Sequence, residues 1–245
     1  MGFPTTHWTL LAKASLCGDA ESRHALEELC RRYWMPIFRF IRSRGISEIE
    51  AQDLTQEFML HILEKSIFFR ADRFQGRFRS FLIGALVRFL GDAMDRRMAL
   101  KRGGTVQHVS YDTSDMAAET TVASLGGDGA IVFDHEWALT ILERALKRVR
   151  GEYAETRHEN ELAVLKNFLP GGAEPPPYEI AAKQIGLSVP AFKSEIHRLR
   201  RRLRSLVREE VAQTVSAPHE IEAETAHLQR VLMDRSNELF QRGEI

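Results

Sequence analysis

A run of basic side chains late in the chain has the most readily stated chemistry. Guanidinium groups bind phosphate oxygens, so such a run suits a polyanion such as DNA. The whole chain is neutral, with 34 basic and 34 acidic side chains, but residues 211–245 hold six acids against three bases. Because a polyanion responds to the local field, this segregation outweighs the neutral total. The bases of residues 193–208, interrupted by one acid, Glu195, are Lys193, Arg198, Arg200, Arg201, Arg202, Arg204 and Arg208.

The segment "IAAKQIGLSVPAFKSEIHRLRRRL", residues 180–203, predicts two helices joined by a tight turn. Gly186 can take the left-handed conformation that ends a helix. Ser188 can cap the next helix, and Pro190 suits a first helical turn. The pattern therefore predicts a helix-turn-helix, whose first helix we expect to bury Ile180, Ala181 and Ile185.

The second of these helices is predicted to have one packed face and one open, basic face. At 100° per residue its apolar positions, Phe192, Ile196, Leu199, Leu203 and Leu206, fall within a narrow arc. The opposite side and its flanks carry Pro190, Lys193, Ser194, His197, Arg198, Arg201, Arg204 and Arg208. Such a helix fits a DNA major groove about 12 Å wide, with its first residues near base edges and later arginines on phosphates. A solvated basic face is the alternative, but the turn, the short preceding helix and the one-sided arginines together favour DNA contact.

A second basic segment, "FFRADRFQGRFRSF" at residues 68–81, alternates arginine with phenylalanine. Aromatic rings can stack on unpaired bases while arginines neutralise the strand, which would make this a single-strand reader. The alternative is a hydrophobic core, because Phe78, Phe81 and Phe89 share a helix face and most phenylalanines are buried. Local chemistry favours the core, whereas a duplex reader elsewhere in the chain raises the case for strand capture.

The elements that would position these residues are predicted to be helices throughout. Apolar periodicity predicts helices over about 20–44, 47–65, 77–98, 134–149, 161–169 and 219–239, and Pro36 is expected to kink or restart the first. Ser47, three residues before Glu50, is expected to cap the second of these helices. Residues 103–133 have the Gly, Ser, Thr and Asp content of a linker. We therefore predict an all-α chain with helical modules at 1–102 and 134–215, a flexible linker at 103–133 and an acidic helical extension at 216–245.

Several function classes are disfavoured. Two cysteines, Cys17 and Cys30, cannot form a disulfide scaffold, and reduced thiols fit a cytoplasmic protein. His24 lies between them, but the spacing does not place three donors on one helical face, so we expect no metal and no cofactor. No nucleophile motif, phosphate loop or paired carboxylates indicate an enzyme. The N-terminus lacks a signal-peptide pattern, and the longest apolar run is interrupted by Arg88, so membrane insertion is not expected.

Three motifs in order give the chain a resemblance to the extracytoplasmic-function sigma factors, the small two-domain bacterial transcription initiation factors. "AQDLTQEFMLHILEK" (51–65) resembles the helix that docks on core RNA polymerase. "GRFRSFLIGALVRFLGDAMDRRMALKRGG" (76–104) resembles the stretch that reads and melts the minus-ten element. "YEIAAKQIGLSVPAFKSEIHRLRRRLR" (178–204) resembles the reader of the minus-thirty-five element.

The resemblance implies a role for each set of matching residues. Polymerase docking falls on Asp53, Leu54, Gln56, Glu57 and Phe58. Upstream DNA reading falls on Pro190, Lys193, Ser194, His197, Arg198, Arg201 and Arg204. Downstream reading and melting fall on Arg77, Phe78, Arg79, Phe81, Arg88, Arg96, Arg97, Lys101 and Arg102.

The chain also departs from the family pattern. Glu195 stands where many relatives carry a base, although it could pair with Arg198 or Arg202. Arg88 stands where asparagine is frequent, Phe81 replaces a frequent tryptophan, and the tail beyond 215 resembles a longer variant. The implied partners are core RNA polymerase and promoter DNA, as duplex and as melted strand, with an anti-sigma or other regulatory protein left open. The alternative is a stand-alone helix-turn-helix regulator that acts without stable polymerase association.

Overall fold

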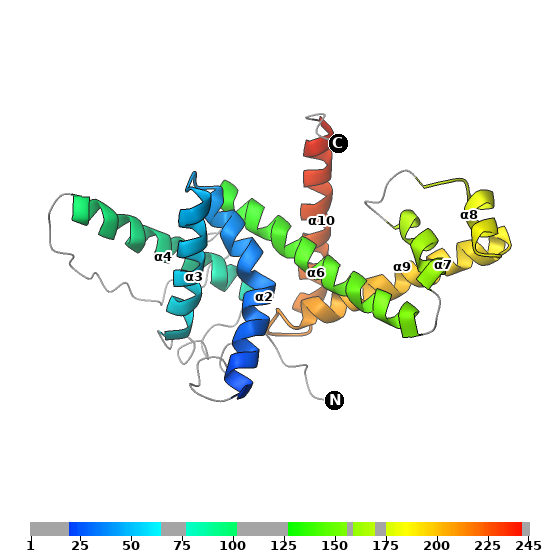
Figure 1. Cartoon of the computed structure of the whole chain (residues 1–245), viewed down its shortest axis with the longest axis horizontal. Helices are drawn as coiled ribbons and strands as arrows, with labels where there is room; N and C mark the ends of the chain where they lie inside the picture. The colour runs from blue at the N-terminus through cyan, green and yellow to red at the C-terminus, as the bar shows by residue number, and fades with distance from the viewer. Residues whose placement is uncertain (1–19, 65–76, 102–126, 156–158, 170–174, 242–245) are drawn as a thin grey trace. The chain divides into compact units, whose positions relative to one another are not determined.

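The computed structural model describes residues 20–64, 77–101, 127–155, 159–169 and 175–241 (Figure 1). Every regular element in these ranges is helical, which confirms the all-α prediction. In chain order the elements are α2 (Ala20–Arg42), α3 (Glu48–Glu64), α4 (Phe78–Lys101), α6 (Asp128–Glu155), α7 (Glu159–Leu165), the 3-10 helix η3 (Lys166–Phe168), α8 (Tyr178–Gln184), α9 (Val189–Ala212) and α10 (Glu220–Gln241). No helix in the described ranges is both long and apolar enough to cross a membrane.

The chain divides into two compact units, and the division is not a simple halving of the sequence. The first unit comprises Met1–Leu139 together with Ala212–Ile245, and the second comprises Thr140–Val211. Helix α6 begins in the first unit and ends in the second. The sequence instead placed a boundary at residue 134, which lies inside this continuous helix.

The turn between α2 and α3 follows local rules of helix termination. Gly45 has φ 78°, a conformation that costs glycine little and other residues more. The Ser47 hydroxyl then accepts a hydrogen bond from the Glu50 amide at 3.4 Å, as predicted for the cap of the next helix. Helix α2 continues through Pro36 up to Arg42, so the expected restart at this proline does not occur.

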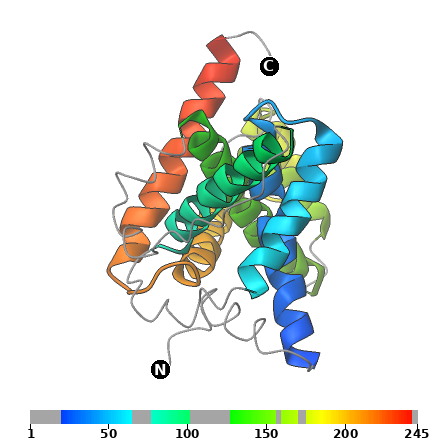
Figure 2. The ribbon, with the colours of Figure 1, turned by 90° about the vertical axis from the view of Figure 1, so that its left-hand side faces the viewer.

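Helix α4 packs against other helices of the first unit on different sides. Figure 2 shows it with α3 on one side and α10 on the other. The Phe89 ring lies 5.4 Å from that of Phe58 on α3, and the Phe78 ring lies 5.2 Å from that of Tyr33 on α2. All four rings are buried. Full burial of each large apolar side chain contributes roughly 1.5–3 kcal/mol, so aromatic packing is a main support of this unit.

The second unit is built around the packed face of α9. The five positions predicted from periodicity are all buried and contact buried residues of α6, η3 and α8. Ala181 and Ala182 of α8 also face this core, but Ile180 is 54% exposed. The expectation that Ile180 is buried was therefore wrong. In α8 the buried residues are Ala181 and Ala182, and these two alanines make the contact with the core instead.

Two segment assignments also need correction. The predicted linker at 103–133 extends too far, because residues 128–133 already form the first turns of α6, while 103–126 lie outside the described residues. Gly129 allows this first part of α6 to lie close to Phe40 of α2, since a Cβ atom at position 129 would be 3.0 Å from the Phe40 ring. The predicted extension at 216–245 contains a helix, α10, and this helix belongs to the first unit, an attachment that the sequence left open.

Candidate nucleic-acid interface

The turn between α8 and α9 is fixed by backbone hydrogen bonds. Gly186 has φ 71°, its amide donates to the Lys183 carbonyl at 3.2 Å, and the Leu187 amide donates to the Ala182 carbonyl at 3.0 Å. This pair of bonds is the glycine-dependent ending of a helix known as a Schellman motif. The Ser188 hydroxyl then accepts from the Ala191 amide at 3.4 Å and caps α9, as the sequence predicted.

One face of α9 is exposed along its first four turns and carries the polar residues assigned to upstream DNA. All of these assigned residues are exposed: Pro190, Lys193, Ser194, His197, Arg198, Arg201 and Arg204. The opposite face is buried from Phe192 to Leu206. The helix thus has an exposed polar face opposite a buried apolar one.

An aromatic cluster holds the start of α9 in place. Phe168 of η3 stacks on Tyr178 of α8 at 5.2 Å and meets Phe192 of α9 edge-on at 5.1 Å. Lys193 extends its ammonium over the Tyr178 ring, 4.9 Å from the centroid. Such a cation–π contact at an exposed site contributes about 0.5–1 kcal/mol, so it orients Lys193 while leaving it exposed.

The arginines of α9 fall into two groups with different partners. Arg200 donates from both Nε (3.1 Å) and Nη2 (2.6 Å) to the Phe168 carbonyl, which ties η3 to the middle of α9. Arg198 pairs with Glu195 one turn earlier, one of the two pairings that the sequence left open. Arg200 therefore serves the second unit's own structure, as does Arg202, whose Nε lies 2.9 Å from Glu152 of α6, whereas Arg201 and Arg204 are exposed side chains of the polar face.

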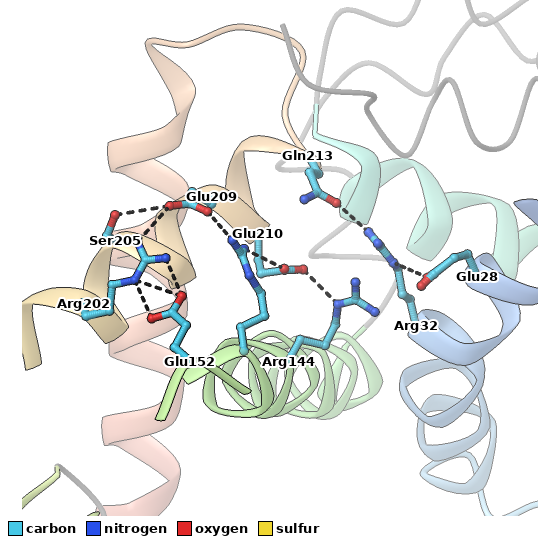
Figure 3. A network of polar contacts seen from close by, with 10 residues as sticks. Glu28, Arg32, Arg144, Glu152, Arg202, Ser205, Glu209, Glu210 and Gln213 are labelled. Carbon is cyan, nitrogen blue, oxygen red and sulfur yellow. Dashed lines mark hydrogen bonds and ion pairs between the residues drawn. The ribbon is translucent and has the colours of Figure 1, made fainter. Parts of the chain in front are cut away.

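Alternating charges join α6 to α9 within the second unit, as Figure 3 shows. Arg144 contacts Glu210 at 2.8 Å, Arg148 contacts Glu209 at 2.6 Å, and Arg202 contacts Glu152 with its Nε at 2.9 Å. Partners on α9 descend from 210 to 202 as those on α6 ascend from 144 to 152, so the two helices run antiparallel. The hydrogen bond from Arg202 lowers the pKa of the Glu152 carboxyl, because it favours the charged form of this acid.

The first turn of α4 differs from the sequence-based assignment to melted DNA. Phe78 is fully buried and Phe81 nearly so, which agrees with the core alternative. Arg79 is also buried and contacts Asp134 and Glu224, and Arg77 contacts Glu224 at 2.9 Å. The two phenylalanines are held by aromatic and apolar packing, and the two arginines by acidic residues from distant segments, which no local sequence pattern indicated.

The other downstream residues are only partly described. Arg88 is half-buried, and Arg96 lies 3.4 Å from Glu57 of α3. Arg97 and Lys101 belong to α4, but their side chains lie outside the described residues, as does the whole of Arg102. The phenylalanines and arginines of 68–76 also lie outside these ranges.

Helix α3 separates its predicted docking residues into two groups. Leu54 and Phe58 are buried in the core of the first unit, whereas Asp53, Gln56 and Glu57 are exposed. The structure adds two exposed apolar residues that sequence reasoning missed, Ile49 (76% exposed) and Leu60 (50% exposed). Their signal was their spacing, because positions 49, 53, 56 and 60 fall on one side of a helix.

No site for a metal is found in the described ranges, which contain no group of three potential ligands. Cys30 is half-buried and burial raises the pKa of its thiol, while Cys17 lies outside the described residues.

Comparisons with protein-family models, with curated proteins and with solved structures found no match to this chain.

Proposed function

We propose that this chain is a transcription initiation factor that binds bacterial core RNA polymerase and directs it to promoters. The observation that carries the proposal is the exposed polar face of α9, which follows the glycine turn after α8 and is backed by a buried apolar face. We infer that α8 and α9 act as a helix-turn-helix and that α9 enters the major groove of the upstream element.

Within this proposal the residues of α9 divide by position. Pro190, Lys193 and Ser194 lie at the N-terminal end, which faces base edges in groove-bound helices. Arg201 and Arg204 lie two to three turns later and contact phosphates, which supply affinity without sequence information. Arg202 is assigned no DNA contact because Glu152 already neutralises it.

The exposed side of α3 is the proposed polymerase contact. Ile49 and Leu60 provide apolar contact area, and Asp53 and Glu57 provide negative charge between them. A surface of this kind suits a partner helix with apolar and basic side chains, because buried apolar area gives affinity and charge complementarity gives orientation. The resemblance of residues 51–65 to polymerase-docking helices points to the same role.

Strand capture in this proposal rests on the later part of α4 and not on its first turn. Phe78, Phe81 and Arg79 are buried, and their release would expose large apolar area and unpair buried charge. Arg88 is the described base of α4 that remains for the melted strand, because Arg96 already lies 3.4 Å from Glu57. The proposed action is binding rather than bond chemistry: two DNA-binding units on one chain raise each other's effective concentration at a correctly spaced promoter.

Polymerase dependence distinguishes this function from a stand-alone regulator. The test first selects promoter fragments with the chain and core polymerase together. It then compares the retardation of these fragments by the chain in the presence and in the absence of purified core enzyme. We expect stable specific complexes only with core polymerase. Specific retardation by the chain alone, together with no association with core enzyme, would identify a stand-alone regulator.

The docking surface has its own test. Replacing Asp53 and Glu57 together with alanine should lower affinity for core polymerase while circular dichroism shows unchanged helicity, because both side chains are exposed. The matched control is a second double variant, in which the exposed Glu143 and Glu155 of α6 are both replaced with alanine. Unaltered polymerase affinity in the Asp53/Glu57 variant would remove α3 from the interface.

A further inference from the structure

A buried polar cluster among the described residues of the first unit joins three segments that lie far apart in sequence. The Arg79 guanidinium of α4 places Nη1 2.9 Å from both carboxylate oxygens of Asp134 on α6. Its Nε lies 3.1 Å from Glu224 on α10. Glu224 has no exposed surface, and Arg79 and Asp134 are below one-tenth exposed. A base and two acids from three helices therefore meet away from water.

Neighbouring groups complete this cluster. Arg77 gives Glu224 a second cation at 2.9 Å, and His227 of α10 lies 2.9 Å from Asp134. The Arg79 guanidinium also lies over the Trp137 ring of α6, 5.7 Å from its centroid. Each carboxylate thus lies within ion-pair distance of two nitrogen-bearing groups, and buried charges are costly unless they are paired.

The backbone just before α10 is attached to the same place. The Phe78 amide, at the first residue of α4, donates to the Thr214 carbonyl at 3.0 Å. Thr214 and Val215 are buried, and Leu228 continues the buried side of α10. Arg32 of α2 donates to Gln213 at 2.9 Å, as Figure 3 shows. The segment from Gln213 to Leu228 therefore contacts α2, α4 and α6.

Two roles for this contact can be compared by what each would require. A detachable cover that frees Arg79 for DNA would have to leave the Asp134 carboxylate short of a partner and open the packing around Phe78. Phe78 is also covered from another side by Tyr33 of α2, so removing α10 would not present its ring to a base. A permanent wall requires no such rearrangement, and the complete burial of Glu224 favours it.

We propose that the C-terminal segment from Gln213 to Leu228 is a permanent wall of the first unit, and that Glu224 is a positioning residue that sets the N-terminal end of α4 through Arg79. The functional part of this inference rests on the proposed function, in which α4 carries strand capture. The segment that follows the DNA-reading helix in the sequence would then serve the strand-opening unit and not the reader.

The structural part can be tested in the full chain without polymerase. Glu224→Gln keeps the side-chain size and removes its charge, and Asp234→Asn makes the same change at an exposed position of α10. Because the substitution removes the carboxylate that Arg77 and the Arg79 Nε share and leaves only Asp134 to compensate Arg79, we expect amide exchange across residues 78–90 to accelerate roughly tenfold or more in Glu224→Gln. Exchange across residues 199–206 of α9 should stay unchanged, and Asp234→Asn should match the parent chain throughout. Equal protection of α4 in both variants would overturn the proposal.

The functional part uses run-off transcription with core polymerase. Glu224→Gln should reduce transcripts from duplex promoters about tenfold, in proportion to the loss of positioned α4, and Asp234→Asn should leave them unchanged. Glu224→Asp retains the charge and should give an intermediate loss, which keeps the test decisive if the glutamine variant folds poorly. A gain of transcription in Glu224→Gln would identify a detachable cover and overturn the proposal. If the parent chain gives no transcripts, the proposed function fails, while hydrogen exchange still decides the structural claim.

Discussion

The first turn of α4 and helix α9 both combine arginines with phenylalanine, but they place their arginines in different environments. In α4, Arg79 is buried and bound by Asp134 and Glu224, and the phenylalanines beside it are core. In α9, Phe192 is buried but Arg201, on the far side of the helix, is exposed. Residue type alone therefore does not separate an arginine that supports the fold from one available to a ligand.

The difference arises from what the rest of the chain brings to each helix. Helix α9 has packing partners on one side, so its apolar periodicity alone indicates which arginines are exposed. The start of α4 has α2, α6 and α10 around it, and two of these contribute acids. An arginine surrounded in this way needs carboxylates, and they come from positions 55 and 145 residues away.

The same substitution in the two regions should change the unfolding free energy by very different amounts. Arg79→Met leaves two buried carboxylates short of a partner and should cost about 3–5 kcal/mol of unfolding free energy. Arg201→Met, at an exposed position, should change it by less than about 0.5 kcal/mol. Urea denaturation followed by circular dichroism measures both, and similar losses in the two variants would erase the distinction between these regions.

The geometry that exposes one face of α9 depends on the turn before it. Gly186→Ala forces a Cβ atom into the left-handed conformation and should destabilise the second unit by about 1–2 kcal/mol. Gly91→Ala on α4 is the matched control: the position is helical and exposed with no atom within 4 Å of a new Cβ, so it should gain about 0.5–1 kcal/mol. Thermal unfolding distinguishes them, and a tolerated alanine at 186 would show that the turn is adaptable.

Adjacent arginines of α9 sharpen the comparison further. Arg201→Ala should lower the salt dependence of promoter-complex formation by about one unit in the slope of log K against log salt, as loss of one phosphate contact does. Arg202→Ala should leave that slope unchanged, because Arg202 contacts Glu152. Equal slopes in the two variants would mean that the contact between Arg202 and Glu152 does not decide which of these two arginines binds DNA.

The smallest expected effect concerns pH. Arg202 holds the pKa of Glu152 below its usual 4.5, so the pair adds stability above that pH and loses it as pH falls through the lowered value. The stability difference between the parent chain and Glu152→Gln should therefore shrink below about pH 4.5. Both side chains are substantially exposed, so the effect should be small and screened by salt. Acid titration of unfolding checks it, and a difference that persists at the lowest pH would assign the effect to packing.

Sequence reasoning succeeded where structure depends on neighbours in the chain. The helical class, the cap at Ser47, the turn at Gly186 and the buried face of α9 all follow from local spacing and are confirmed. It failed where distant segments meet: the buried acids around Arg79 and the attachment of α10 to the first unit have no local signature. Ile180 shows a smaller failure of the same kind: the neighbouring Ala181 and Ala182 pack in the core, and Ile180 is exposed.

The most direct test of the central proposal is run-off transcription from a genomic fragment library with purified bacterial core RNA polymerase, followed by mapping of start sites. We predict discrete start sites that share upstream and downstream elements and that appear only when the chain is added, with fewer transcripts for Arg201→Met. Absence of chain-dependent start sites, together with no association between the chain and core polymerase, would contradict the proposal.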